Sequence, residues 1–589
     1  MAATRVMPRL VRAARASDVE AAGVMVVNLD GQSVALFAHK GRIYAVDNRC
    51  PHMGFPLHRG SVADGILTCH WHHARFDLAT GGTFDQFADD LPCYRVEARD
   101  GEVWVDLAPR GDPTGYHLRR LREGLEHEIP LVVAKASIAL AAAGMDPAEP
   151  FRIGLDFGTR YRREGWGMGL TILTCLANLV PFLDPADRPR AHLQGLAATA
   201  RDAGGRAPRF AIAPLPGAAP DLATLTRWFR RFVEVRDEEG AERCIVTAVR
   251  AGAGDREMAG MIFAAATDHR FLSTGHVLDF TNKAFEALDR AGWEHAEGIL
   301  ASLAPAYAGA SRSEELNSWR HPVDLVALLQ GAFDRLPAAL EQGARRDPWP
   351  MGAGRRELIG VLLGEDAVAI VDALVGALAA GCPPERLAGI VTHAAALRIA
   401  RFPVTNEFGD WDTSLHTYTF ANAVHQGLCR VHAPELVRGL FDAAARVYLD
   451  RFLNVPPARL PDATEPDEDA DAILAELPGL LDRRHQVNAA GTLVARYLGT
   501  GAEPKRLLAR LGTMLLREDR DFHTIQTLEA SVRQWTIAME EGRAEDGLPL
   551  LVAAARYLAA HAPTMRSQDQ TYTIALRLSR GERLYEDVD

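Results

Sequence analysis

Two short cysteine–histidine pairs near the N-terminus constrain this chain more than any other feature. Cys50 and His52 lie in CPHMGFPL, Cys69 and His72 lie in CHWHHARFDLATGG, and sixteen residues separate the two pairs. Proline and glycine in the first segment restrict the backbone and permit close approach of a second loop. The fold must therefore bring two tight loops, distant in sequence, to one point.

The four side chains of these pairs form a set of metal ligands. Two thiolates on one iron and two imidazoles on the other hold one type of [2Fe–2S] cluster. The same donors also suit a structural zinc ion, but zinc pairs usually follow C-x2–4-C and H-x3–5-H spacing. Here each pair joins a cysteine to a histidine. The spacing therefore favours an iron–sulfur cluster over zinc.

The residues around both pairs predict a small antiparallel β domain from about Arg9 to Leu107. Short apolar runs with period-2 alternation surround the motifs. Asp30-Gly31, Lys40-Gly41 and Asp100-Gly101 interrupt these runs, and such dipeptides are typical of tight hairpin turns.

With these motifs, residues 9–107 resemble a Rieske ferredoxin-type domain. The resemblance implies that Cys50 and Cys69 bind one iron, that His52 and His72 bind the other, and that exposed imidazole edges form the electron port. The additional histidines, His70 and His73, lie off the motif and are interpreted as non-ligands.

The number of cysteines in the domain differs from that of the respiratory members of this group, and the difference indicates which type of Rieske domain the sequence resembles. High-potential respiratory Rieske proteins resemble this pattern but carry an extra cysteine in each loop, which form a disulfide. Cys93 is the only other cysteine between residues 9 and 107. The resemblance therefore implies the lower-potential type found in ferredoxins and oxygenases.

Composition restricts the cellular context. No apolar run of 18 residues is free of charge, which argues against a membrane span. The net charge is −12 without a Lys/Arg-rich cluster, which argues against nucleic acid as a partner. The seven cysteines are scattered, and this pattern favours the reducing cytoplasm. We therefore expect a cytoplasmic protein.

The remainder of the chain predicts a large all-α domain. Residues 108–115 form a Gly/Pro-rich linker, and long Ala/Leu-rich amphipathic stretches follow. The predicted organisation is an all-β domain at 1–107, a linker at 108–115 and a domain of repeated helical units at 116–589.

Three segments of the helical region repeat the same order of elements. An apolar helix (256–266, 385–396, 505–516) precedes a short acidic loop, a helix that opens with histidine (276–288, 416–428, 523–535) and a closing amphipathic helix. A degenerate fourth copy without the histidine precedes them at 165–184. Such repeats predict a layered array of helices that is solenoid-like or nearly closed.

A polar stripe runs along each histidine helix. The stripes comprise His276, Asp279 and Asn282; His416, Thr419 and Asn422; and His523, Gln526 and Glu529. Residues three apart share one helical face. These groups could simply cap helices and bond neighbouring loops. If the repeats curve around a common axis, however, the stripes face one another across a cavity.

Such a cavity predicts a second metal, because imidazole and carboxylate with open positions suit non-haem iron. The candidate ligands are His269, His276, Asp279, His393, His416 and His523. His425 is a further candidate, but it follows His416 by nine residues and therefore need not lie on the same face of the helix. Alone, His393 on its Ala-rich helix is more typical of a buried core histidine. Asp410 and Asp412 are interpreted as helix caps, and His485 and His561 as surface residues.

Two of these histidine segments carry a second resemblance. HRFLSTGHVLDF, with His269 and His276, and HTYTFANAV, from His416, resemble motifs of questin oxidase-like proteins. That group is all-helical and includes Baeyer–Villiger-type oxidases of aromatic polyketides. The resemblance implies oxygen chemistry on an organic substrate.

Two functions follow from these patterns. The first is an oxidoreductase in which a reductase or ferredoxin reductase supplies electrons to the cluster, and O2 reacts with a small organic substrate in the helical domain. No G-x-G-x-x-G nucleotide motif and no D-x2-H-x4-H motif of ordinary Rieske oxygenases is found. The alternative is a helical docking scaffold with a tethered Rieske ferredoxin that acts as electron carrier or redox sensor.

Overall fold

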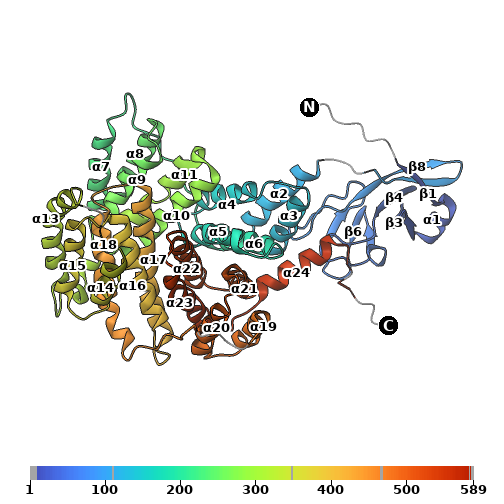
Figure 1. Cartoon of the computed structure of the whole chain (residues 1–589). Coiled ribbons are helices and arrows are strands. Elements are labelled where there is room, and N and C mark those ends of the chain that lie inside the picture. Colours follow the sequence, from blue (N-terminus) through green and yellow to red (C-terminus); the bar gives the residue numbers. More distant parts are fainter. Residues whose placement is uncertain are drawn as a thin grey trace. The chain divides into compact units, whose positions relative to one another are not determined.

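The computed structural model describes residues 9–108, 112–346, 349, 351–463, 468–582 and 584–585. The chain divides into two compact units. The first comprises Met1–Pro147 together with Gln568–Asp589, and the second comprises Ala148–Ser567. The predicted fold class, a small all-β domain followed by a large helical region, is confirmed (Figure 1).

The strands of the first unit form two antiparallel sheets. The larger has the order β1-β9-β8-β4-β3-β2, and the smaller has the order β5-β6-β7. Their bounds are β1 (Leu10–Arg15), β2 (Val24–Leu29), β3 (Gln32–His39), β4 (Arg42–Asp47), β5 (Ser61–Ala63), β6 (Ile66–Thr68), β7 (Arg75–Asp77), β8 (Cys93–Arg99) and β9 (Glu102–Asp106).

The predicted hairpin turns are confirmed. Asp30-Gly31 joins β2 to β3, Lys40-Gly41 joins β3 to β4, and Asp100-Gly101 joins β8 to β9. All six of these residues have positive φ, between 49° and 86°. This backbone matches the twist of the flanking strands, and Gly adopts it without steric cost.

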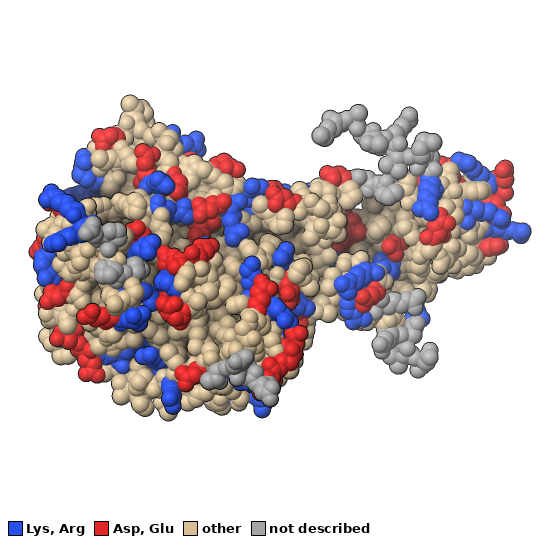
Figure 2. Space-filling model, in the orientation of Figure 1, with Lys and Arg blue, Asp and Glu red and all other residues tan. Residues whose placement is uncertain are grey.

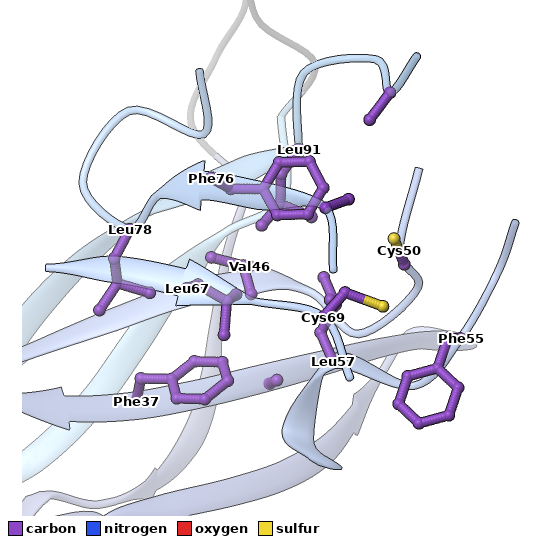
Figure 3. Close-up of a cluster of buried hydrophobic side chains, with 13 residues drawn as sticks. Phe37, Val46, Cys50, Phe55, Leu57, Leu67, Cys69, Phe76, Leu78 and Leu91 are labelled. Carbon is purple, nitrogen blue, oxygen red and sulfur yellow. The ribbon is translucent and has the colours of Figure 1, made fainter. Parts of the chain in front are cut away.

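Strand β3, which lies between β4 and β2, is buried on both faces. Val34 and Leu36 point into one apolar core, whereas Ala35 and Phe37 point into a second core that also contains both motif cysteines. Figure 3 shows the two sulfur atoms near each other at one end of this second core. Both cysteines of the motif loops are thus anchored in this core.

The first unit also contains helices, the first two within the predicted β domain and the others outside it. They are α1 (Ala16–Ala22), η1 (Leu57–Arg59), α2 (Pro113–Glu126), α3 (Pro130–Ala142) and, from the end of the chain, α24 (Ser567–Ser579). Arg120 of α2 pairs with Asp89 and donates hydrogen bonds to the carbonyls of Gln86 and Ala88. These contacts explain why the compact unit extends past the predicted linker.

The second unit is built of helices. Its α-helices are α4 (Ala148–Arg160), α5 (Met168–Leu179), α6 (Arg188–Ala203), α7 (Leu222–Glu234), α8 (Glu238–Arg250), α9 (Asp255–Ala266), α10 (His276–Ala291), α11 (Ala296–Ala301), α12 (Ala304–Ala308), α13 (Leu325–Gly343), α14 (Met351–Leu362), α15 (Ala367–Ala379), α16 (Pro384–Ala400), α17 (Phe408–Arg430), α18 (Val437–Leu449), α19 (Ala470–Leu481), α20 (Val487–Gly499), α21 (Pro504–Leu516), α22 (Phe522–Glu540) and α23 (Gly547–Ala560). Short 3-10 turns are η2 (Val180–Phe182), η3 (Leu272–Gly275), η4 (Trp293–His295), η5 (Ser313–Glu315), η6 (Asn317–Trp319), η7 (Asp450–Asn454) and η8 (Ala544–Asp546).

Four helices of the second unit, one from each predicted repeat copy, pack in a closed ring. Helix α5 contacts α10, α10 contacts α17, α17 contacts α22, and α22 contacts α5. Helix α5 lies in the degenerate copy, and the other three carry the histidines. The repeats therefore enclose a central four-helix bundle, and their polar stripes turn into its interior.

One helix begins earlier than predicted. The prediction placed an acidic loop before His416, but α17 already begins at Phe408. A reciprocal capping interaction between Glu407 and Asp410 closes its first turn. Asp410 thus acts as the predicted capping residue, whereas Asp412 lies inside the helix. The prediction for Asp412 is therefore wrong.

None of the described helices has the length and hydropathy needed to cross a membrane. On the face drawn in Figure 2, Lys and Arg side chains are interspersed with Asp and Glu. That face therefore presents mixed charge rather than a basic stripe.

Candidate metal centres

The two motif loops of the first unit are tight and closed by backbone hydrogen bonds. The loop after β4 holds Cys50 and His52, and the amide N–H of Cys50 donates to the carbonyl of Phe55 at 2.8 Å. The loop between β6 and β7 holds Cys69 and His72, and Cys69 N–H donates to the Ala74 carbonyl at 2.9 Å. The loops therefore present their side chains on one edge of the domain.

The sulfur atoms of both cysteines are buried and hydrogen-bonded. Amide N–H groups of the residues that follow each cysteine donate to its sulfur. The Cys50 thiol donates to Cys69 and, against the effect of burial, lowers the pKa of Cys69 to about 6; the same proximity raises the pKa of Cys50. Such surroundings suit thiolates that bind a metal.

The two imidazoles complete the set. The ring centroids of His52 and His72 lie 4.9 Å apart at 82°. Burial lowers the pKa of His52 to about 4, with smaller contributions from His72 and Lys135, and burial also lowers the pKa of His72. The buried Nδ1 of His52 has no hydrogen-bond partner among the described residues. Two thiols, two neutral imidazoles and an unpartnered nitrogen fit a [2Fe–2S] cluster with mixed ligands.

Helix α3 and the C-terminal segment hold the first motif loop from two sides. Lys135 Nζ donates to the Pro51 carbonyl at 2.6 Å and pairs with Asp89. Arg49 Nη2 donates to the Leu578 carbonyl at 3.0 Å. The Tyr585 ring lies 4.9 Å from that of Phe55 and 5.7 Å from that of Trp71. Residues far from the motif thus stabilise both cluster loops.

We predict that Tyr585→Ala makes the cluster labile. Each aromatic pair contributes about 0.5–1.5 kcal/mol, so losing the two contacts with Phe55 and Trp71, about 1–3 kcal/mol together, should favour loop opening by about five- to 150-fold. The rate at which a chelator removes iron from the oxidised cluster should rise by that factor. Tyr161→Ala, which truncates a half-buried tyrosine of the second unit, is the matched control. Equal rates in both variants would contradict the stabilising role.

Three histidines of the second unit meet at one point. Their ligand nitrogens all lie within 4.8 Å of one another, and His416 Nε2 lies 3.1 Å from His523 Nε2. The His276 ring centroid is 4.7 Å from that of His416 and 5.9 Å from that of His523. Each side chain comes from a different helix of the ring and is partly exposed. The group is therefore within reach of small molecules.

The surroundings of the three imidazoles favour their neutral forms. Burial lowers the pKa of His276 to about 4, and nearby His523 adds to the effect. Burial together with the other two imidazoles lowers the pKa of His416 to about 3, and burial lowers the pKa of His523. Their lone pairs are available for a metal. The donor set fits a metal that prefers imidazole, such as iron or zinc.

The Asp412 carboxylate lies next to the His523 imidazole, on the side away from the other two histidines. Asp412 Oδ2 lies 3.9 Å from His523 Nδ1, while its Oδ1 accepts a hydrogen bond from Tyr557 at 2.6 Å. This orientation leaves His523 Nε2 facing the other histidines, as metal-binding histidines commonly require. His561 stacks on Tyr557 with centroids 4.2 Å apart and is 5% exposed. The prediction of a surface position for His561 is therefore wrong, because it packs at the end of α23.

The loop before His276 is strained. Phe271, Ser273 and Thr274 have φ between 46° and 56°, and Gly275 has φ 94°. Left-handed conformations of non-glycine residues are costly and concentrate at functional sites. Ser273 N–H donates to the Ser311 carbonyl at 2.9 Å, which helps to hold the loop. The strained turn fixes His276 as the first residue of α10.

The other predicted ligands lie apart from this group. His269 bridges Glu234 and Glu314 at 2.7 Å each, and Asp279 accepts a hydrogen bond from Gln526. His393 is buried with Nε2 3.7 Å from Asp546. His425 bonds Gln534, and His485 is exposed as predicted. Of the ligands predicted in the helical region, His276, His416 and His523 are the ones whose ligand atoms lie within 4.8 Å of one another among the described residues.

Comparison with known proteins identifies the first unit's β domain. Residues 9–95 match the family model of the Rieske [2Fe-2S] domain. The ferredoxin component of the naphthalene 1,2-dioxygenase system of Pseudomonas putida is 29% identical over 99 residues, 17% of this chain and 95% of that protein. Human apoptosis-inducing factor 3 is 27% identical over 175 residues. This match covers 29% of the present chain and only 27% of the human protein, so the two share a part of their lengths.

Further relatives match stretches of similar length. The oxygenase subunit of vanillate O-demethylase from Pseudomonas sp. is 40% identical over 88 residues, 13% of this chain and 24% of that protein. Among solved structures, the ferredoxin of Sphingomonas yanoikuyae B1 is 25% identical and covers 17% of this chain and 98% of its own, with a TM-score of 0.16. The predicted Rieske domain is thus confirmed, and the resemblance of the helical region to questin oxidase-like proteins stays a prediction.

Proposed function

We propose that this chain, whose residues 9–95 form a Rieske [2Fe–2S] domain, is an oxidoreductase with a second redox metal in its helical unit. Cys50, His52, Cys69 and His72 hold the cluster, and His276, His416 and His523 hold a non-haem iron. The observation that carries the proposal is the convergence of three neutral imidazoles from three repeats within 4.8 Å. Three protein ligands leave positions open for exogenous molecules.

A bound iron would supply one-electron chemistry with O2, and the surrounding residues would hold and orient it. The Asp412 carboxylate, 3.9 Å from His523 Nδ1, places a negative charge behind that imidazole, and the strained turn at Ser273 and Thr274 positions His276. A small organic substrate enters at the partly exposed edges of the imidazoles. The residues thereby bind and orient the metal while admitting both reactants.

The electrons come from a separate reductase or ferredoxin reductase. The similar Pseudomonas protein is the ferredoxin component of a dioxygenase system, which supports an electron-transfer role for the Rieske domain. Here the electron donor and the proposed oxygen site share one chain. This linkage raises the effective concentration of the donor domain at its acceptor.

A second function is supported by the same relative. The ferredoxin component is a small electron carrier, and the Rieske domain here is similar to nearly its whole length. In this alternative, the helical unit is a docking scaffold, and the tethered cluster serves a separate enzyme or senses redox state. It requires no metal at the three histidines.

Iron stoichiometry separates the two functions. We expect the purified wild-type chain to contain about three iron atoms, two in the cluster and one at the histidines. His416→Ala should lower the content to about two and leave the cluster's EPR signal unchanged. His432→Ala, at an exposed histidine after α17, is the matched control and should retain about three. Two iron atoms in every variant would support the scaffold instead.

A further inference from the structure

Two charged side chains lie beside the first motif loop. Lys135 of α3 donates a hydrogen bond from Nζ to the Pro51 carbonyl at 2.6 Å, and Pro51 directly precedes the cluster ligand His52. The Lys135 ammonium also pairs with the Asp89 carboxylate, and their side chains are 14% and 18% exposed. Because little solvent surrounds them, the two charges act on nearby groups with less screening than surface charges do.

The loop that carries Asp89 reaches the same ligand from another side. The ring of Phe87, two residues before Asp89, lies 4.9 Å from the His52 ring at an angle of 66°. Arg120 of α2 holds this loop, because its Nη2 donates to the backbone carbonyls on either side of Phe87 at 2.9 Å each. Arg120 Nε also donates to Asp89 Oδ1 at 2.9 Å. Helix α2 therefore fixes the carboxylate and the aromatic ring together against the loop of His52.

The carboxylate of this pair stays ionised near neutral pH. Burial favours the protonated form of Asp89, but Lys135 and Arg120 outweigh this effect and lower the pKa of its carboxyl. The Glu123 carboxylate accepts a hydrogen bond from Arg120 Nη1 at 2.6 Å and balances that guanidinium. His117 of α2 is a further titratable group near the pair, and burial lowers its pKa, so it adds no charge near pH 7. Lys135 and Asp89 therefore place two opposite charges beside the cluster loops.

We propose that Lys135 and Asp89 set the reduction potential of the Rieske cluster, with Lys135 raising it and Asp89 lowering it. Reduction adds one electron to the cluster, so a nearby positive charge stabilises the reduced form and a nearby negative charge destabilises it. Neither side chain binds iron. Both are positioning residues that act on the cluster through their charge and through the loop of His52.

The charge pair joins the Rieske domain to the two helices that follow it. Asp89 lies within residues 9–95, which match the family model, whereas Lys135 and Arg120 come from α3 and α2. These helices thereby adjust the driving force with which the cluster takes up electrons and passes them on. The inference goes beyond the proposed function, because it requires the cluster alone and holds with or without iron at the three histidines.

A redox titration of the full chain, followed by the EPR signal of the reduced cluster, tests the proposal. Lys135→Met should lower the midpoint potential, and Asp89→Asn should raise it. A unit charge within about 10 Å, at an effective dielectric constant near 20, changes the equilibrium between the reduced and the oxidised cluster by about tenfold. For a one-electron couple, this factor corresponds to a shift of about 59 mV.

Two further variants separate the effect of charge from that of packing. Lys135→Arg keeps the positive charge and a donor for the Pro51 carbonyl, so its potential should stay close to that of the wild type. Lys40 is an exposed lysine in the turn before β4, whereas the first motif loop follows β4. Lys40→Met removes an equal charge from the far end of that strand and should leave the potential unchanged.

The signs of the two shifts decide the outcome. A fall in Lys135→Met together with a rise in Asp89→Asn supports the proposal, because a loosened loop has no reason to respond with opposite sign to the two substitutions. Shifts of the same sign, or wild-type potentials in both variants, overturn it. If Lys135→Met assembles no cluster, Asp89→Asn still decides, since a rise of about tenfold supports the proposal and the absence of a rise overturns it.

Discussion

Cys69→Ser is expected to remove the [2Fe–2S] cluster. Cys69 is 1% exposed and its sulfur receives backbone hydrogen bonds, and serine oxygen is a poor replacement for a soft thiolate. Iron content should fall by about two atoms per chain, and the EPR signal of the reduced cluster should vanish. Electron delivery from any donor should end with it. EPR and iron analysis of the purified variant measure both effects.

A second cysteine of the same domain, and the separate compact helical unit, provide controls for this prediction. Cys93 lies in the same domain, but burial raises the pKa of its thiol to about 12, which keeps it protonated and unsuited to bind metal. Cys93→Ser should therefore keep the cluster. The helical unit Ala148–Ser567 is compact by itself, so Cys69→Ser should leave its helicity and its iron unchanged. Global unfolding of Cys69→Ser, or loss of the cluster in Cys93→Ser, would contradict the assignment.

The β domain could be predicted from the sequence because its signals are local. Turn dipeptides such as Asp30-Gly31 specify hairpins by their own backbone preferences, and both motif loops carry their ligands within four residues. The order of strands is then restricted by hairpin connection. The full extent of the first unit could not be predicted in this way, because α24 contacts the motif loops through single interactions such as the hydrogen bond from Arg49 to the Leu578 carbonyl. No periodic pattern in the sequence predicts contacts of that kind.

The three-histidine group could be predicted in part. The recurrence of histidine at one register predicted that His276, His416 and His523 face a common cavity, and the closed ring of helices brings them together. The pattern did not separate them from His269 or His393, whose partners are carboxylates of distant helices. Asp412 was missed as a partner of His523, because its role depends on how α17, α22 and α23 pack.

His276→Ala is expected to stop electron flow after the cluster. We expect the chemically reduced wild-type cluster to be reoxidised by O2 through the second iron, and loss of one of three ligands should empty that site. Reoxidation should slow by at least about 100-fold, since the remaining two imidazoles bind iron weakly. The reduced spectrum of the cluster should be unchanged, because the Rieske ligands lie in the other unit. Stopped-flow absorbance after mixing with O2 measures the rate.

Asp412→Asn provides the graded comparison. It retains all three imidazoles but removes the carboxylate charge 3.9 Å from His523 Nδ1, which should lower metal affinity by about tenfold, the lower end of the range for partners of metal-binding histidines. Added iron should therefore restore reoxidation in Asp412→Asn but not in His276→Ala. Rapid reoxidation in both variants without added iron would mean that O2 takes electrons from the Rieske cluster directly. The three histidines would then have no part in electron transfer. If a metal at these histidines accepts the electrons, reoxidation must slow when a ligand is removed and must recover when iron is added to a site that keeps its ligands.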